Sequence, residues 1–239
     1  MSGYKSQKEK FFSVRRMTLL AAMSAITVVM YNFLAIRAVP GFPFFLSLDI
    51  SDAPVLLTGF MLGPLAGAIV VLIRFLLKLP MTSTMGVGET ADLILGLTFV
   101  LTASLVYKKT RTKQGAMIGL GIGIITTTAV AVIVNRFILV PFFVWYIFGG
   151  SWDALLNALG PIYPGITRDN FFVYYLLLAT IPFNLIRLLI CGLIVFALYK
   201  RLQKIIKKIE RKNDAIIETI DEDEQMPAET IRDDKSIAE

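Results

Sequence analysis

The sequence predicts an all-α integral membrane protein, a bundle of six transmembrane helices. Of its 239 residues, 56% are hydrophobic and 18% are charged, whereas a soluble domain is about 45–50% apolar and about 25% charged. Twelve of the 18 acidic residues lie outside residues 17–200, so this long apolar block keeps six. The chain therefore divides into a basic leader (1–16), a transmembrane domain (17–200) and a charged tail (201–239).

The first two apolar regions predict three helices. The run from Met17 to Leu34 follows basic residues, as in a signal peptide, but it is long and comparable runs follow it, so we expect a retained helix. Residues 53–79 contain Gly63-Pro64. Because Gly ends helices and Pro fits a first turn, we expect two short helices joined by a tight turn. One span kinked at Pro64 is the alternative.

Three further runs predict helices at Val87–Tyr107, Ala116–Val140 and Tyr174–Leu198. Pro141 is expected to end or kink the helix Ala116–Val140. Pro182 lies inside the last helix, where neighbouring side chains or water must bond the backbone groups that the proline leaves without a partner. The segment 149–172 is rich in Pro and Gly and predicts a long structured loop.

Basic residues predict the orientation. With six helices, the leader, the 108–113 loop and the flank after residue 200 share one side and carry most of the Lys and Arg. The positive-inside rule then places both termini in the cytoplasm of a multi-pass plasma-membrane protein. A five-helix count would leave one strongly basic flank outside.

The composition argues against catalysis. The chain has no His and a single Cys, Cys191, which excludes His or multi-Cys metal sites, Ser–His or Cys–His nucleophile pairs and an intramolecular disulfide. It also lacks the GxxxxGK[ST] motif of ATP-hydrolysing P-loops. We therefore expect no enzyme activity, no metal, no cofactor and no nucleic-acid partner.

Polar side chains within the predicted spans indicate a binding pocket. Such groups are costly in a membrane and mark functional sites. Glu89 and Asn135 fall toward the outer ends of their helices, and Asn184 and Arg187 fall near the middle of the last one. Asn can both donate and accept hydrogen bonds. This pattern predicts an outward-facing pocket for a polar solute.

Other charged residues have a structural interpretation. Lys78 can extend its ammonium group to the membrane surface. Asp92 can pair with Arg74 or Arg136 and so lock the bundle together.

Two loops are expected to contribute to the pocket. The loop Val39–Asp52 carries Phe44, Phe45 and Leu46, which can stack on a flat ligand, although an interfacial aromatic belt is an equal alternative. The segment Thr82–Glu89 is rich in Gly and hydroxyls and allows close backbone approach.

A small-residue face on the first helix includes Ala21 and Ala25. The spacing allows another helix to pack closely, either a partner's or one of this chain.

Four sequence segments, taken in order, resemble the substrate-binding S components of energy-coupling factor (ECF) transporters, most of all the riboflavin-specific members. The segments are Ala21-xxx-Ala25, FLSLDISDAPVLLTGFMLGPLAG (45–67), TMGVGETAD (84–92) and IPFNLIRLLI (181–190). The similarity covers Val14–Leu202. It implies a six-helix subunit that binds riboflavin outside and delivers it with a transmembrane coupling subunit and two cytoplasmic ATPases. It also implies that Ala21 and Ala25 dock on the coupling subunit.

The flavin-binding residues are predicted from the polar and loop positions described above together with this resemblance. They are Phe45, Leu46, Ser47, Leu48, Asp49, Met85, Gly86, Glu89, Asn135, Asn184 and Arg187. Family members carry Lys where this chain has Arg187, whose planar fork suits a phosphate, so FMN is a second expected ligand. An S component for another vitamin and a stand-alone transporter remain alternatives.

Overall fold

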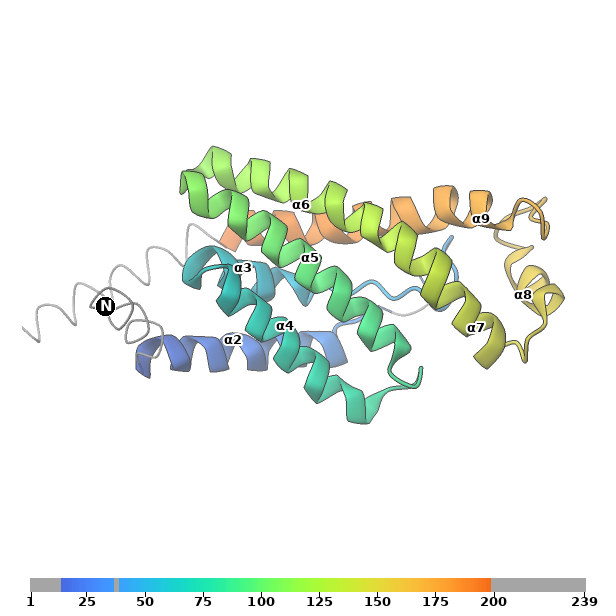
Figure 1. Ribbon diagram of the computed structural model, residues 1–239, viewed down its shortest axis with the longest axis horizontal. Coiled ribbons are helices and arrows are strands. Elements are labelled where there is room, and N and C mark those ends of the chain that lie inside the picture. The colour runs from blue at the N-terminus through green and yellow to red at the C-terminus, as the bar shows by residue number, and fades with distance from the viewer. Residues whose placement is uncertain (1–13, 37–38, 199–239) are drawn as a thin grey trace, which may run out of the picture. The chain divides into compact units, whose positions relative to one another are not determined.

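The computed structural model describes residues 14–36 and 39–198 (Figure 1). The predicted leader up to residue 13 and the predicted tail from residue 201 lie outside the described residues. The chain divides into two compact units between Val195 and Phe196, and the description below concerns the first. In the described part, five helices are long and apolar enough to cross a membrane, and a sixth apolar helix is shorter.

The expected break at Gly63-Pro64 is confirmed. The first helix, α2, spans Val14–Phe33, so it begins three residues before the predicted boundary. Helix α3 (Asp52–Leu62) and helix α4 (Pro64–Lys78) are separate. Gly63 between them has φ +103°, a conformation that side chains with a Cβ rarely adopt. The alternative of one kinked span is therefore wrong.

Helices α5 (Val87–Thr110) and α6 (Lys113–Val134) form a long pair that runs side by side in Figure 1. Their connection is tight, because Arg111 adopts a left-handed conformation and the Thr112 side chain accepts a hydrogen bond from the amide of Gly115 at 3.0 Å. Threonine at this position satisfies an amide that the first turn of α6 leaves free.

Glycines allow close packing in the half of the bundle near the α5–α6 connection. A Cβ on Gly119 would lie 2.6 Å from the backbone oxygen of Ala103, and one on Gly59 would lie 2.2 Å from the Ser104 hydroxyl. A Cβ on Gly67 would lie 2.4 Å from Val100. Side chains of any size would force α3, α4, α5 and α6 apart. We call this region the glycine-packed end.

Of the two outcomes predicted for Pro141, an end or a kink of its helix, the structure shows the kink (Figure 1). The helix continues without interruption from Lys113 to Tyr146. A π-helical segment, η2 (Asn135–Leu139), precedes α7 (Val140–Tyr146), and Figure 1 shows the helix changing direction there. Proline clashes with the carbonyl four residues earlier, and that residue, Phe137, lies in the widened turn.

The last helix of the described part repeats this arrangement. It begins with α9 (Phe171–Tyr174), three residues earlier than expected, and continues to Leu198. The π-helical segment η3 (Tyr175–Thr180) ends two residues before Pro182. Its widened turn contains Leu178, four residues before Pro182, so the proline is accommodated without a break.

The segment predicted as a loop contains an additional helix, α8 (Trp152–Leu159). The Ser151 side chain accepts from the Ala154 amide at 3.2 Å, which satisfies one free amide of the first turn. Leu155 and Leu159 are fully buried against Phe171 and the rest of an aromatic core cluster. Amphipathic spacing within eight residues thus builds a helix despite the surrounding Pro and Gly.

Candidate ligand-binding site

A cavity of about 320 Å³ lies at the end of the bundle opposite the α5–α6 connection. It is bordered by the loop after α2, the C-terminal end of α4, the start of α5, the η2–α7 segment and the last helix. Its volume is within the range of about 300–1,000 Å³ that small-molecule sites occupy. The cavity is large enough for a drug-sized ligand.

Most of the predicted site residues line this cavity. Those that do are Phe45, Leu46, Ser47, Glu89, Asn135, Asn184 and Arg187. They come from the first loop, α5, η2 and the last helix, which lie far apart in the sequence. The structure therefore brings them together at one site.

Four predicted residues lie outside the cavity lining. Leu48 pairs with Ile36 in an isolated antiparallel bridge, with both N···O distances 2.8 Å. Asp49 is buried behind the cavity wall. Met85 has φ +51° and its side chain is 63% exposed, because the left-handed turn directs it outward. Gly86 forms the N-cap of α5 with φ +84°, so its contribution is to the turn.

Glu89 is held by two hydroxyl groups. Its Oε2 accepts from Oγ1 of Thr82 at 2.7 Å and from Oγ1 of Thr84 at 2.8 Å. Glu89 lies in the first turn of α5, where the positive end of the helix dipole favours a negative charge. The side chain thus presents a carboxylate at the cavity wall.

The two cavity amides are each fixed by one bond to their own helix. Nδ2 of Asn135 donates to the carbonyl of Ala131 and Nδ2 of Asn184 donates to that of Thr180, both at 2.8 Å. Oδ1 of Asn135 also accepts from the hydroxyl of Tyr175 at 2.7 Å, which joins the two π-helical segments. Each amide keeps a second N–H for a ligand, because an amide group has two donors.

Aromatic rings cover the apolar part of the cavity. Phe45 lies with its ring centroid 4.9 Å from that of Phe143 and 6.0 Å from that of Tyr175. Phe44 contacts Phe45 and also Phe148, at 5.3 and 6.3 Å between centroids. Rings at these separations leave flat faces on which a planar ligand can stack.

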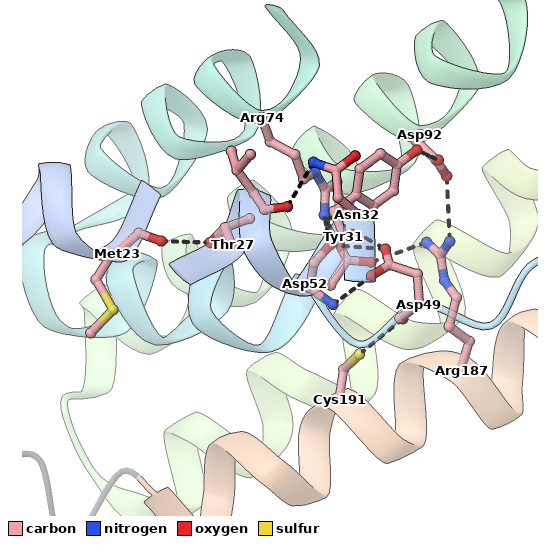
Figure 2. A network of polar contacts seen from close by, with 12 residues as sticks. Met23, Thr27, Tyr31, Asn32, Asp49, Asp52, Arg74, Asp92, Arg187 and Cys191 are labelled. Atoms are coloured by element: carbon pink, nitrogen blue, oxygen red, sulfur yellow. Dashed lines mark hydrogen bonds and ion pairs between the residues drawn. The ribbon is translucent and has the colours of Figure 1, made fainter. Parts of the chain in front are cut away.

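Five charged side chains form an ion-pair cluster beside the cavity (Figure 2): Asp49, Asp52, Arg74, Asp92 and Arg187. Asp52 is its centre. One carboxylate oxygen lies 2.8 Å from Nη1 of Arg74 and the other 3.0 Å from Nη2 of Arg187. Asp52 is 1% exposed, so its charge is stabilised by these two partners.

The partners of Asp92 differ from those predicted. Asp92 accepts from Nη1 of Arg187 at 3.4 Å and from the Tyr31 hydroxyl, and it pairs with neither Arg74 nor Arg136. Arg136 is exposed and lies over the ring of Phe172, 4.2 Å from its centroid. The bundle lock is present, but it joins α5 to the last helix and to α2.

Asp49 belongs to the cluster through Ser51. Asp49 accepts from the Ser51 amide at 2.7 Å and from its hydroxyl at 2.9 Å, and the same hydroxyl accepts from Nη1 of Arg74 at 2.7 Å. Burial raises the pKa of Asp49 above its ordinary value, and the Arg74 guanidinium acts in the opposite direction. Asp49 therefore orders the loop next to the cavity.

Helix α2 contacts the cavity through Tyr31, a residue that the sequence does not predict at the site. Two cations of α4 lie near its ring, with the Arg74 guanidinium 5.2 Å and the Lys78 ammonium 4.9 Å from the centroid. Lys78 also donates to Oδ1 of Asn32 at 3.0 Å. Lys78 thus lines the cavity.

The cluster leaves Arg187 little capacity for a phosphate. Both of its terminal nitrogens bond carboxylates, Asp52 and Asp92. Within the described residues its Nε is buried and has no hydrogen-bond partner. Two of the five N–H groups of Arg187 are thus used, and its charge is already balanced by two carboxylates beside it.

Ala21 and Ala25 lie on the exposed side of α2, away from the cavity. Their neighbours Ala22, Ile26 and Val29 are exposed too. Between Arg16 and Phe33, 11% of the residues of this helix are buried. Most of α2 therefore presents an apolar, small-residue surface.

Comparison with known proteins identifies relatives of the whole transmembrane region. Residues 15–199 match the family model of the ECF transporter substrate-specific component. The chain is 33% identical to the riboflavin transporter RibU of Staphylococcus aureus (strain TCH60) over 195 residues, which cover 82% of this chain and 94% of that protein. It is 29% identical to the riboflavin transporter FmnP of Bacillus subtilis (strain 168) over 139 residues, 56% of this chain and 71% of that protein.

A solved structure has the same fold. It is described as the S component of a bacterial ECF transporter, and it superposes with a TM-score of 0.61 at 30% sequence identity. The match covers 81% of this chain and 98% of that chain. The residues matched by the family model, 15–199, include those that form the cavity, the ion-pair cluster and the exposed face of α2.

Proposed function

The chain belongs to the substrate-specific components of ECF transporters, and from that premise we propose that its cavity binds riboflavin for uptake across the membrane. It is a membrane-embedded transport subunit of an ECF module, and its family points to substrate binding instead of catalysis. Two relatives are named riboflavin transporters.

The composition of the cavity supports this ligand. Phe45 and Phe143 present aromatic faces suited to a flat ring system. Glu89, Asn135 and Asn184 present acceptors and donors suited to ring edges and sugar-alcohol hydroxyls. A single cavity that combines flat apolar walls with such groups is the observation that carries the proposal.

Riboflavin fits this arrangement better than FMN does. Arg187 is the feature that favours a phosphorylated flavin, because its fork can bind two phosphate oxygens. In the ion-pair cluster both terminal nitrogens are engaged by Asp52 and Asp92. The charge of Arg187 is thus already balanced, and a phosphate bound there would lie next to the like-charged carboxylates of Asp52 and Asp92.

The proposal includes an orientation and partners. The cavity faces the cell exterior and both termini are cytoplasmic, because the exposed basic residues at 108–113 lie at the opposite end from the cavity. Ala21 and Ala25 dock on a transmembrane coupling subunit, which works with two cytoplasmic ATPases. The exposed small-residue face of α2 supports this docking.

Equilibrium binding to the purified protein tests the ligand. We expect quenching of flavin fluorescence at micromolar riboflavin, and flavin absorption bands in a preparation from riboflavin-fed cells. Glu89→Ala should weaken binding about 10- to 150-fold and Asn184→Ala about 2- to 10-fold, as for hydrogen bonds to charged and neutral groups. Asp153→Ala, on the exposed side of α8, is the matched control. No quenching by the unmodified protein would refute the ligand assignment.

Transport separates binding from docking. Ala21→Leu and Ala25→Leu add bulk to the exposed face of α2 and should leave riboflavin affinity unchanged while uptake in cells is lost. Leu76→Ala, at an exposed apolar position of α4, controls for a general effect on the membrane surface. Normal uptake by both leucine variants would show that the docking face lies elsewhere.

A further inference from the structure

The loop between α4 and α5 is ordered by two threonine side chains. The Thr82 hydroxyl accepts from the amide of Thr84 at 3.1 Å and from that of Gly86 at 3.0 Å. The Thr84 hydroxyl accepts from the amide of Gly88 at 3.1 Å. Both hydroxyls therefore already act as acceptors toward backbone donors.

This arrangement defines the direction of the bonds to Glu89. A hydroxyl carries one hydrogen, and an amide N–H can only donate. Because Thr82 and Thr84 accept from backbone amides, their hydrogens are available for the oxygen that lies 2.7 and 2.8 Å away, Oε2 of Glu89. Glu89 receives two donated bonds at one oxygen, which is the pattern that suits an ionised carboxylate.

The second oxygen of Glu89 is left for the cavity. Within the described part of the chain, no donor bonds Oε1, while Glu89 lines the cavity. A carboxylate held at one oxygen has lost most of its rotational freedom, so the other oxygen stays in one direction. The ligand group that meets it must be a donor.

The backbone of the loop makes this contact possible. Met85 and Gly86 adopt left-handed conformations, with φ +51° and +84°, which turn the chain back toward α5. A Cβ on Gly88 would lie 2.8 Å from Oγ1 of Thr84. Glycine at this position therefore lets the Thr84 hydroxyl approach both the start of α5 and Glu89.

We propose that Thr82 and Thr84 are positioning residues for substrate binding: they hold Glu89 as a fixed hydrogen-bond acceptor for a donor group of the ligand. The proposal rests on the proposed function of the cavity, and it names how one wall achieves specificity. Thr82 does not line the cavity, so it acts through Glu89. Thr84 lines the cavity and contributes in the same way.

Thr82→Val tests the proposal, because valine keeps the shape and removes the hydroxyl. We expect about a fivefold loss of riboflavin affinity for Thr82→Val and about a tenfold loss for the Thr82→Val/Thr84→Val double variant, since positioned charge-assisted bonds are strong. Thr82→Ser should restore affinity to within about twofold. Thr90→Val is the control, because Thr90 is exposed and its hydroxyl bonds the Gly86 carbonyl on the same helix.

A double-mutant cycle separates positioning from a general structural role. In the Glu89→Ala background, Thr82→Val should have no further effect on affinity, because the residue it positions is gone. An undiminished loss in that background, or an unchanged affinity for Thr82→Val alone, would overturn the proposal.

Thermal unfolding of the ligand-free protein provides a measurement that needs no riboflavin. The same cycle should show coupling between Thr82 and Glu89 in the melting temperature. Additive shifts would contradict the bond itself. If the unmodified protein bound no riboflavin, the proposed function would fail, while this cycle would still decide whether Thr82 holds Glu89.

Discussion

The glycine-packed end and the cavity end of the bundle use the same helices in opposite ways. At the glycine-packed end, Gly59, Gly67 and Gly119 let α3, α4, α5 and α6 approach so closely that an added Cβ would collide with a neighbouring helix. At the cavity end, the ion-pair cluster, two π-helical segments and two left-handed residues interrupt this regular packing.

The difference shows how a membrane bundle can hold a polar cavity. Space for a ligand requires helices to separate, and separated helices lose the contacts that stabilise them. The ion-pair cluster replaces those contacts with charge-assisted bonds, while the glycine-packed end maintains the helix spacing. Close helix packing and ligand binding are thus located in different halves, which predicts that substitutions at the glycine-packed end can change stability without changing binding.

The largest effect is expected at the centre of the ion-pair cluster. Asp52→Ala removes the carboxylate shared by Arg74 and Arg187 and leaves two buried guanidiniums without their main partner. Loss of one member of a buried ion pair costs about 3 to 5 kcal/mol. Thermal unfolding in detergent should show this loss, whereas Asp153→Ala at an exposed site should change the free energy of unfolding by less than about 0.5 kcal/mol. Equal effects would contradict the role of the cluster.

A pair of substitutions tests the other end. Gly119→Ala places a methyl group against the Ala103 carbonyl and should destabilise the protein by about 1 to 3 kcal/mol. Gly121→Ala, two residues along the same helix, meets nothing within 4 Å and should stabilise by about 0.5 to 1 kcal/mol. Riboflavin affinity of the folded fraction should be unchanged in both. Weaker binding by Gly119→Ala would show that the two ends are coupled.

A smaller effect is expected where the two π-helical segments meet. Tyr175→Phe removes the hydroxyl that donates to Oδ1 of Asn135 and should cost about 0.5 to 1.5 kcal/mol. The Asn135 amide then keeps only its bond to the Ala131 carbonyl and is held less firmly, so riboflavin binding by fluorescence titration should weaken about 2- to 10-fold. Tyr146→Phe, near the end of α7 and exposed, is the matched control and should leave affinity unchanged.

The smallest effect is expected at the edge of the cavity. Lys78→Met keeps the apolar stem but removes the bond to Asn32 and the cation over the Tyr31 ring. Such partly exposed contacts contribute about 1 kcal/mol or less. If thermal unfolding showed a loss as large as that of Asp52→Ala, the charge balance of this end would depend on Lys78 as well.

Local signals predicted much of the fold. Gly63-Pro64 defines the break between α3 and α4 because one residue supplies the left-handed conformation and the next one starts a helix. The polar residues Glu89, Asn135 and Asn184 were predicted at the site because burial in a membrane is costly without a function. These inferences need no knowledge of the neighbours of each residue.

Features that depend on three-dimensional pairing were not predictable. Asp92 had several arginines available in the sequence, and the partner it contacts, Arg187, is decided by how α5 and the last helix pack. Met85 is adjacent to site residues, but one left-handed turn directs its side chain outward. Tyr31 is one aromatic residue in a hydrophobic helix, and nothing in the sequence around it distinguishes a cavity residue from one that packs in the bundle.

The π-helical segments change the sequence interval at which side chains of the cavity walls point in the same direction. In a regular α-helix each residue advances about 100°, so positions eight apart differ by about 80° around the axis. One widened turn accommodates about one additional residue without additional rotation about the helix axis. Eight residues that include such a turn therefore rotate by about as much as seven regular ones, which is within about 20° of two full turns.

Asn135 and Phe143 face the cavity from one wall, and Tyr175 and Phe183 are buried along the other, at this same interval of eight. If the same residues formed a regular helix with no widened turn, the side chains beyond η2 or η3 would be rotated by about 100°. The angular register of the backbone thus selects which side chains meet the ligand, and the widened turns before Pro141 and Pro182 set that register.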